Sequence, residues 1–216
     1  MRLRLGTPRA ALVIAPHPDD EVIGAGKLIR VLRRRGARVA VVVVSDGAAS
    51  HPGSRRWPRA RLVAERQRET RRALRRLGVT AREIVFLGLP DGALSQVPGD
   101  CRRALRREIA RRRPLDLLVG PAHDDHHPDH RAVAAAMAGG GTAARRLAYR
   151  IWPAWRERRG RSLRLPAGAA TVGKRQLIRC YRTQCGAIRD DPGGFSIARH
   201  ELDAFSHPIE WFEDRR

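Results

Sequence analysis

Residues 11–36 read ALVIAPHPDDEVIGAGKLIRVLRRRG, and this stretch predicts a strand, a polar turn and a helix in succession. The apolar run Ala11–Ala15 is typical of a strand that is covered on both faces. From Asp20 to Arg35, apolar residues recur at helical spacing, and Gly36 follows three arginines as a stop signal. This order is the opening unit of a parallel α/β sheet.

Further apolar runs and helical patterns repeat this unit. The additional predicted strands are Val39–Val44, Ile84–Leu87 and Leu115–Val119, and the helices between them are Arg59–Leu77 and Asp100–Arg113. The alternation predicts an α/β fold with a Rossmann-like, doubly wound and mostly parallel sheet in three α/β/α layers.

Beyond the fourth predicted strand the pattern is less regular. We expect a helix over Pro128–Met137 and helical structure over Thr171–Cys185, whereas residues 148–170 show no clear period. Because the chain contains no internal repeat and no low-complexity linker, a single domain over residues 1–216 is expected.

Length and composition indicate a globular chain with a strong positive charge. The 216 residues carry 44 Lys+Arg against 22 Asp+Glu, a formal net charge of +22, and 42% of them are hydrophobic. No apolar run approaches the roughly 18 residues that span a bilayer, and the N-terminus does not read as a signal peptide. The three cysteines form no CxxC pair, which suits a reducing compartment. We therefore expect a cytoplasmic protein.

The positive charge favours anionic partners but has two interpretations. Only Lys27 and Lys174 are lysines, so an arginine-rich composition is one explanation. Peripheral association with an anionic membrane surface is the other. Specific nucleic-acid recognition is not expected, because the aromatic residues, 5% of the chain, do not interleave with the basic ones.

Two polar clusters follow predicted strands and hold the residues that can carry chemistry. They are Pro16–Glu21, with the sequence PHPDDE, and His123–His130, with the sequence HDDHHPDH and four of the eight histidines. If the first and fourth strands are neighbours, as in the strand order 3-2-1-4, both clusters open onto one crevice.

The residue types of these clusters predict a catalytic metal site. His17 and Asp20, three residues apart at the start of a helix, can point to one centre, and a third ligand can come from the second cluster. Such a set leaves coordination positions open for water and substrate. Asp19 can then face the water without binding the metal, as a general base does.

Both clusters, in this order, resemble the motifs of the PIG-L/LmbE-type zinc-dependent N-deacetylases. The resemblance covers about residues 10–188 and includes further elements: Ser45-Asp46-Gly47, Arg66 with Glu69, the sequence FLGLPDG at 86–92, and Lys174 with the sequence YRTQ at 181–184. Thr183 stands where the family usually has serine.

The resemblance implies roles for individual residues. It makes His17, Asp20 and His130 the ligands of Zn²⁺ or another divalent metal, with Asp19 as the general base. His127 would stabilise the oxyanion or protonate the leaving amine, with Asp129 as its partner. Asp125 is expected to support the histidine cluster, and Arg66 and Asp91 are expected to contact the sugar.

The implied reaction is the removal of an N-acetyl group from an N-acetylglucosamine-type amino sugar in a glycoside or glycolipid. Amide hydrolysis requires a Lewis acid, an activated water and an acid for the leaving nitrogen, and this set of residues supplies all three. Two alternatives remain open. The triplet Asp125-His126-His127 resembles that of the DHH phosphoesterases, and the charge permits a basic nucleic-acid-binding protein. The sequence does not indicate an oligomeric state.

Overall fold

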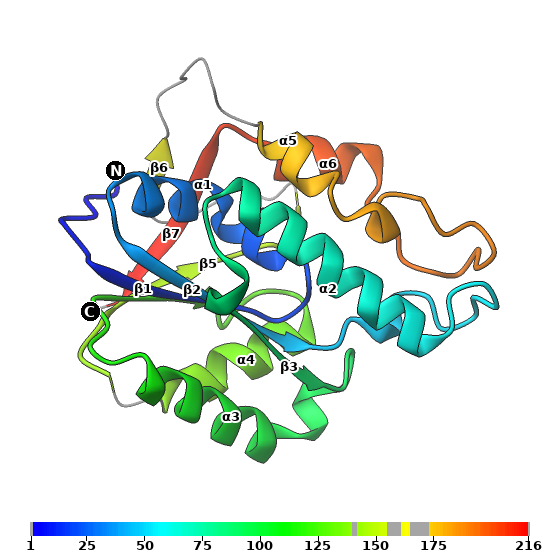
Figure 1. Cartoon of the computed structure of the whole chain (residues 1–216), viewed down its shortest axis with the longest axis horizontal. Helices are drawn as coiled ribbons and strands as arrows, with labels where there is room; N and C mark the ends of the chain where they lie inside the picture. The colour runs from blue at the N-terminus through cyan, green and yellow to red at the C-terminus, as the bar shows by residue number, and fades with distance from the viewer. Residues whose placement is uncertain (1, 140–141, 155–160, 165–172, 216) are drawn as a thin grey trace.

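The computed structural model describes residues 2–139, 142–154, 161–164 and 173–215. Its centre is a seven-stranded sheet with the order β3-β2-β1-β4-β5-β7-β6 (Figure 1). The strands are β1 (Ala10–Ala15), β2 (Arg38–Ser45), β3 (Ile84–Leu89), β4 (Leu117–Pro121), β5 (Arg145–Tyr149), β6 (Arg161–Arg164) and β7 (Ile209–Arg215).

The strand β1 occupies the point at which the strand order reverses. It pairs in parallel with β2 on one side and with β4 on the other, and all six of its residues are buried. The strands β3 and β5 extend the parallel part of the sheet, whereas β7 pairs antiparallel with both β5 and β6. The predicted 3-2-1-4 order and the mostly parallel sheet are confirmed.

Helices cover both faces of the sheet (Figure 1). They are α1 (Asp20–Arg34), α2 (Arg59–Arg76), α3 (Pro98–Arg111), α4 (Pro128–Ala138), α5 (Lys174–Ile178) and α6 (Arg199–Phe205). The helices α1, α2, α5 and α6 lie on one side, and α3 with α4 on the other.

Alternation along β1 builds a separate core for each of these helix layers. Val13 and its neighbours two residues away join the core formed with α1 and α2. Leu12 and Ile14 join the core formed with α3 and α4. Successive side chains of a strand point to opposite faces, so one apolar run supports both layers. The three-layer α/β/α prediction is therefore confirmed.

Charges at the two ends of α1 match its dipole. Asp20 and Glu21 lie in the first turn, and Arg33 and Arg34 in the last. Negative groups near the N-terminus and positive groups near the C-terminus each stabilise a helix by about 0.3–1 kcal/mol when exposed. Here both acids are buried, and both belong to the polar cluster that follows β1.

The structure differs from the sequence-based expectation mainly after β4. The strands β5, β6 and β7 and the helix α6 were not predicted, and the fourth strand begins at Leu117 rather than Leu115. The helix expected over Thr171–Cys185 is the short α5 followed by a 3-10 turn, with residues 171–172 outside the described part. The chain leaves the helical path where Tyr181 and Thr183 bond to buried carboxylates of Glu21 and Glu69.

Within the described part of the chain, no helix is both long and apolar enough to cross a bilayer. The single-domain organisation and the cytoplasmic location remain predictions.

Two glycines of α1 provide a test of the packing between this helix and the sheet. A Cβ at Gly24 would lie 2.4 Å from the buried ring of Tyr149, whereas a Cβ at Gly26 would meet its nearest neighbour, Val22, at 3.5 Å. We expect Gly24→Ala to lower the free energy of unfolding by about 1–3 kcal/mol through overpacking. Gly26→Ala should be neutral or raise it by up to about 1 kcal/mol, because alanine favours the helix. Chemical denaturation of both variants measures the difference, and equal effects would contradict this account of the close approach.

Candidate metal centre and cavity

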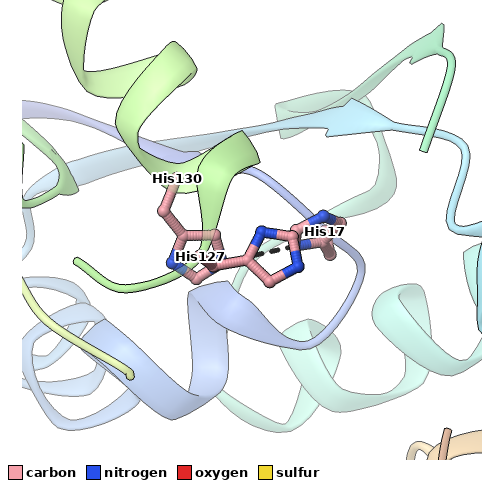
Figure 2. Close-up of side chains that lie close together, drawn as sticks. All are labelled: His17, His127 and His130. Atoms are coloured by element: carbon pink, nitrogen blue, oxygen red, sulfur yellow. Dashed lines mark hydrogen bonds between the residues drawn. The ribbon is translucent and has the colours of Figure 1, made fainter. Parts of the chain in front are cut away.

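The two polar clusters meet at the carboxyl end of the sheet. The first follows β1 and the second follows β4, which is its hydrogen-bonded neighbour. Figure 2 shows the side chains of His17, His127 and His130 gathered there, with ring centroids 4.7–5.2 Å apart. Residues more than 100 positions apart therefore share one site.

Three donor atoms form a small triangle within this site. Nδ1 of His17 lies 3.0 Å from Oδ2 of Asp20, Nε2 of His130 lies 3.1 Å from the same oxygen, and the two nitrogens are 3.3 Å apart. A tetrahedral Zn²⁺ holds nitrogen and oxygen donors at about 2.0–2.1 Å, which separates them by roughly 3.3 Å. The triangle fits such an ion, and two of its three residues, His17 and Asp20, also line the cavity described below.

Neighbouring carboxylates raise the pKa of both histidines in the triangle. Burial by itself lowers the pKa of His130, but the neighbouring Asp20 and Asp125 carboxylates outweigh it and raise this pKa to about 9. Burial likewise opposes a charged His17, yet contacts with Asp129, Asp20 and Asp91 raise its pKa well above the usual value. Opposite charges close to a buried group favour its charged form. The carboxylates therefore create a strongly cation-binding environment.

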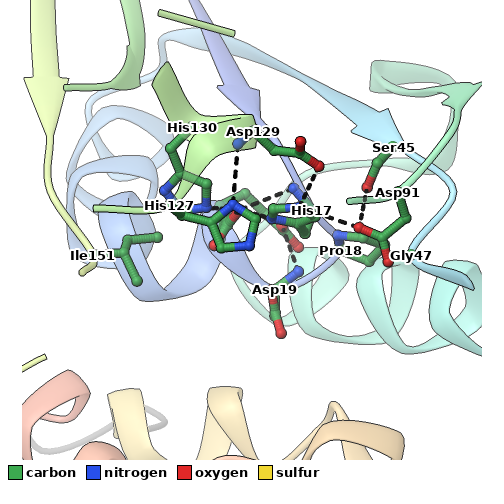
Figure 3. A network of polar contacts seen from close by, with 12 residues as sticks. His17, Pro18, Asp19, Ser45, Gly47, Asp91, His127, Asp129, His130 and Ile151 are labelled. Carbon is green, nitrogen blue, oxygen red and sulfur yellow. Dashed lines mark hydrogen bonds and ion pairs between the residues drawn. The ribbon is translucent and has the colours of Figure 1, made fainter. Parts of the chain in front are cut away.

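A carboxylate also fixes the ring of each of the two histidines on the side away from the triangle. Oδ1 of Asp125 lies 3.2 Å from Nδ1 of His130. Figure 3 shows the other pair, in which Oδ2 of Asp129 lies 3.2 Å from Nε2 of His17. Asp125 in turn accepts hydrogen bonds from the amides of Ile151 and Trp152 at 2.7 and 3.1 Å. Such partners fix the tautomer and orientation of a metal-binding imidazole.

Asp19 sits beside the triangle in an unusual backbone conformation. Its φ is 130°, the one positive φ outside glycine among the described residues. Its amide donates to Oε2 of Glu21 at 3.0 Å, and its Oδ2 lies 3.4 Å from Nη2 of Arg66. Burial raises the pKa of Asp19 well above its usual value, although the charge of Arg66 acts against this. A carboxylate with a raised pKa is a better proton acceptor near neutrality.

The structure places Asp129 differently from the role implied by the resemblance. Its carboxylate accepts from the amides of Gly92 and Leu94 at 2.8 and 3.0 Å and contacts His17. The bond to His127 comes from the backbone, with the Asp129 amide donating to Nδ1 at 3.2 Å. His127 is the N-cap residue of α4, and its ring accepts this hydrogen bond from an amide in the first turn of the helix.

Arg66 also differs from the expectation of a sugar contact. Its guanidinium donates to the carbonyls of Gly47 and Pro18 at 2.9 and 2.7 Å, and the residue is only 3% exposed. These bonds join the turn after β2 to the turn after β1. The same side chain explains the glycine at position 47, where a Cβ would lie 2.8 Å from Nη1. Arg66 is therefore engaged in holding the two turns together.

Asp91 lies between the triangle and the turn after β2. Its Oδ1 is 3.2 Å from Nε2 of His17, and its Oδ2 accepts from the amide of Ala49 at 2.9 Å. Although burial acts against it, contact with His17 lowers the pKa of Asp91. The residue also lines the cavity described next, where a ligand can reach it.

A cavity of about 300 Å³ opens over the triangle. Its polar lining includes residues from the turns after β1, β2, β3 and β4, and its apolar lining comes largely from residues beyond β4. The lining residues are His17, Asp19, Asp20, Ile23, Ala49, Ser50, Arg66, Asp91, Gly92, His127, Ile151, Trp152, Gln184, Phe195, Ile197 and Phe205. Sequence reasoning did not assign the individual apolar residues to the site. Trp152 lies in a stretch without a clear period, and residues 190–197 carry no motif that links them to the clusters.

A larger groove of about 720 Å³ lies at the amino ends of β1 and β2. Its lining combines apolar residues with six arginines, among them Arg38, Arg82 and Arg107, and contains none of the residues of the two clusters. The chemistry-bearing groups therefore belong to the smaller cavity. The groove accounts for part of the positive surface that the composition predicts.

The structure also places the two aspartates Asp124 and Asp125 and the three cysteines. Asp124 of the second cluster is exposed and pairs with Arg150. Cys101, Cys180 and Cys185 are free thiols, of which the first two are buried. Asp125, expected to support the histidines, makes the contacts with His130, Ile151 and Trp152 described above.

The triangle predicts a specific loss of metal on substitution of one corner. His130→Ala removes one donor and should weaken Zn²⁺ binding by more than about 100-fold, because changing only the partners of ligands costs about 10- to 100-fold. His126→Ala, in the same loop but exposed, is the matched control and should retain the metal. Elemental analysis and competition with a chelator measure both. Equal zinc content in the two variants would exclude His130 as a ligand.

The raised pKa values predict that metal and protons compete. With a pKa of about 9, His130 is protonated at neutral pH in the metal-free chain, whereas a metal binds only the neutral ring. Zn²⁺ binding should therefore release about one to two protons at pH 7, and the affinity should rise with pH until the histidines are neutral. Calorimetry in buffers of different ionisation enthalpy measures the release. An affinity that is constant between pH 6 and 9 would contradict the prediction.

Comparison with known proteins agrees with the sequence resemblance. The family described as PIG-L: GlcNAc-PI de-N-acetylase matches residues 12–139, more than half of the chain. The chain is 30% identical over 152 residues to the uncharacterized deacetylase YaiS of Escherichia coli (strain K12), covering 68% of this chain and 76% of that protein. It is 28% identical over 135 residues to a probable N-acetyl-alpha-D-glucosaminyl L-malate deacetylase 2 of Bacillus anthracis, covering 60% and 58%.

Solved structures share the fold at lower sequence identity. The N,N'-diacetylchitobiose deacetylase from Pyrococcus horikoshii superimposes with a TM-score of 0.67 at 22% identity, over 96% of this chain and 84% of that one. GalB, the 4-carboxy-2-hydroxymuconate hydratase from Pseudomonas putida KT2440, also gives 0.67, at 17% identity and over 96% of each chain. The architecture alone therefore accommodates more than one reaction, and the family match decides between them: the chain belongs to the PIG-L (GlcNAc-PI de-N-acetylase) family of N-deacetylases.

Proposed function

We propose that the chain hydrolyses the N-acetyl group of an N-acetylglucosamine-type amino sugar within a glycoside or glycolipid. The observation that carries the proposal is the triangle of His17, Asp20 and His130 beside the buried Asp19, at the floor of a cavity of about 300 Å³. The names of two relatives, a glucosaminyl malate deacetylase and a diacetylchitobiose deacetylase, support this substrate class.

In this proposal His17, Asp20 and His130 hold Zn²⁺, or another divalent ion that accepts the same donors. When bound, such an ion polarises an amide carbonyl and lowers the pKa of water towards about 7. Asp125 and Asp129 orient the two imidazoles from behind.

Asp19 acts as the general base. It is buried beside the triangle, and its pKa is raised by that burial, so it can accept a proton from the attacking water. The same proton can then pass to the nitrogen as the C–N bond breaks, which yields acetate and a free amine. Arg66 holds the Asp19 carboxylate at 3.4 Å and bonds to the adjacent Pro18 carbonyl, so it positions the base.

His127 stabilises the charge that develops on the carbonyl oxygen. Its Nδ1 accepts a hydrogen bond from the Asp129 amide, so in the neutral ring the hydrogen is on Nε2. Burial and the charges of His17 and His130 lower the pKa of His127 to about 4, which keeps the ring neutral at physiological pH. A neutral N–H donor that lines the cavity suits an oxyanion better than it suits proton delivery to the amine.

Asp91 remains the candidate for binding the sugar. It lines the cavity beside Ser50 and Gln184, so hydroxyl groups of a bound sugar would meet one carboxylate and two neutral polar side chains. Arg66 contributes to the same wall mainly through the turns that it joins. Peripheral contact with an anionic membrane is a separate proposal that rests on the net charge of +22.

The phosphoesterase alternative has less support. It requires the triplet Asp125-His126-His127 to act as a unit on a pair of metals. Asp125 is instead occupied by two backbone amides and by His130, and His126 is exposed.

A direct assay separates these reactions. The zinc-loaded chain, incubated with N-acetylglucosamine glycosides, should release acetate and a primary amine in equal amounts. A phosphodiester offered to the same preparation should stay intact. Turnover of the phosphodiester without acetate release would overturn the proposal.

Asp19→Asn tests the base while keeping the shape of the side chain. The variant should retain zinc, because the three donors are untouched, and kcat should fall by about 10²- to 10⁴-fold. Asp100→Asn, in an exposed ion pair on α3, is the matched control and should leave kcat unchanged. Acetate release and zinc content are measured together. A variant that keeps its zinc and its turnover would remove Asp19 from the mechanism.

A further inference from the structure

The cavity has one apolar side that the deacetylation chemistry does not use. Besides Asp91, Ser50 and Gln184, its lining includes a set of apolar residues that we call the apolar side: Ile151, Trp152, Phe195, Ile197 and Phe205, together with Ile23. A sugar ring with its hydroxyl groups needs the polar side. The apolar side therefore requires another explanation.

Three aromatic rings on this side lead from the core to the surface. The ring of Trp152 meets Phe205 edge to face at 5.3 Å and Phe195 edge to face at 6.2 Å between centroids. Phe205 is 1% exposed and Trp152 is half-buried, whereas Phe195 is 38% exposed, which makes it the exposed large hydrophobic residue of the described chain. An aromatic surface thus continues from the inside of the cavity to its rim.

The backbone holds Phe195 at this rim. Its amide donates to the carbonyl of Ser50 at 2.7 Å, and the amide of the preceding Gly194 donates to the carbonyl of Asp191 at 3.0 Å. A Cβ at Gly194 would lie 2.3 Å from the ring of His51, so the turn is packed directly against that ring. Phe195 is therefore presented in a fixed place, which lowers the entropy cost of binding a ligand there.

Two aspartates fasten the same turn to the loop before α2. Asp191 accepts from the amide of Gly53 at 2.8 Å, and Asp190 accepts from Oγ of Ser54 and the amide of Arg56, both at 2.8 Å. In Figure 1 the segment between α5 and α6 runs beside this loop. The rim on this side of the cavity is thus a braced structure rather than a free loop.

We propose that Trp152 and Phe195 form a subsite for an apolar, ring-bearing aglycone of the amino-sugar conjugate. The inference rests on the proposed function for the position of the sugar. A group attached to a sugar above the triangle leaves the cavity at its rim, where Phe195 is exposed. An aryl group there can stack against Trp152 and Phe195 and removes apolar surface from water, whereas a small or charged aglycone gains neither contact.

Binding of a deacetylated ligand tests the subsite independently of turnover. Calorimetry compares the phenyl and the methyl glycoside of glucosamine on the zinc-loaded chain. The phenyl glycoside should bind about 10-fold more tightly, the range expected from one or two aromatic contacts. Phe195→Ala should abolish this preference and leave the affinity for the methyl glycoside within about twofold. Phe195→Tyr should restore the preference.

Further variants separate a local effect from misfolding. Phe86→Ala removes an aromatic ring from β3, outside the cavity lining, and should preserve the preference. Trp152 packs against the core, so Trp152→Phe is used in place of alanine and should reduce the preference in part. Thermal melting of each variant confirms that it is folded.

The outcomes distinguish this proposal from the proposed function. Equal binding of the two glycosides, no binding of the phenyl glycoside, or an equal loss of both in Phe195→Ala would each overturn the subsite. Acetate release from the N-acetyl forms is measured in parallel. Release without a phenyl preference overturns the subsite alone, whereas a Phe195-dependent preference without release supports the subsite and overturns deacetylation.

Discussion

The pairing of β1 with β4 is the constraint on which the site depends. The turn after β1 supplies His17, Asp19 and Asp20, and the loop after β4 supplies His127 and His130. Because both strands are parallel and adjacent, their carboxyl ends lie at one edge of the sheet, and two segments distant in sequence meet there. The uninterrupted burial of β1 keeps this edge in place. Any change that shifted the register between the two strands would separate the donors.

The site concentrates negative charge within a strongly basic chain. Asp19, Asp20, Glu21, Asp91, Asp125 and Asp129 lie within or next to the triangle, although the whole chain has only 22 acidic residues against 44 basic ones. Burial would make each of these carboxylates costly unless it were paired or hydrogen-bonded. The histidines, backbone amides and Arg66 provide such partners in the metal-free chain, and a divalent ion would add a stronger one. The net charge therefore gives little information about the local field.

Sequence reasoning recovered the parallel strands β1 to β4 because each of them contains a continuous apolar run and is followed by a helical period, whereas the parallel strand β5 begins with two arginines and was missed. It also found both polar clusters, since histidine and aspartate rarely gather so densely in a loop by chance. The later elements were missed for physical reasons. β7, with the sequence IEWFEDR, pairs antiparallel near one edge of the sheet and is neither a continuous apolar run nor a regular alternation. The helix α6 is only seven residues long. The roles of Arg66 and Asp129 depend on hydrogen bonds to backbone groups, which leave no pattern in the sequence. The aromatic wall joins residues from β5 onward that are distant from either cluster.

The backbone at Asp19 has a consequence for which residues this position tolerates. A φ of 130° is accessible to glycine, whereas a side chain here costs conformational free energy. Neighbouring contacts, such as the hydrogen bond from the Asp19 amide to the Glu21 carboxylate, must offset this cost. Substitution of Asp19 by glycine would relieve the backbone strain and remove the carboxylate at the same time. At this one residue, local backbone stability favours glycine, whereas the proposed reaction requires a carboxylate.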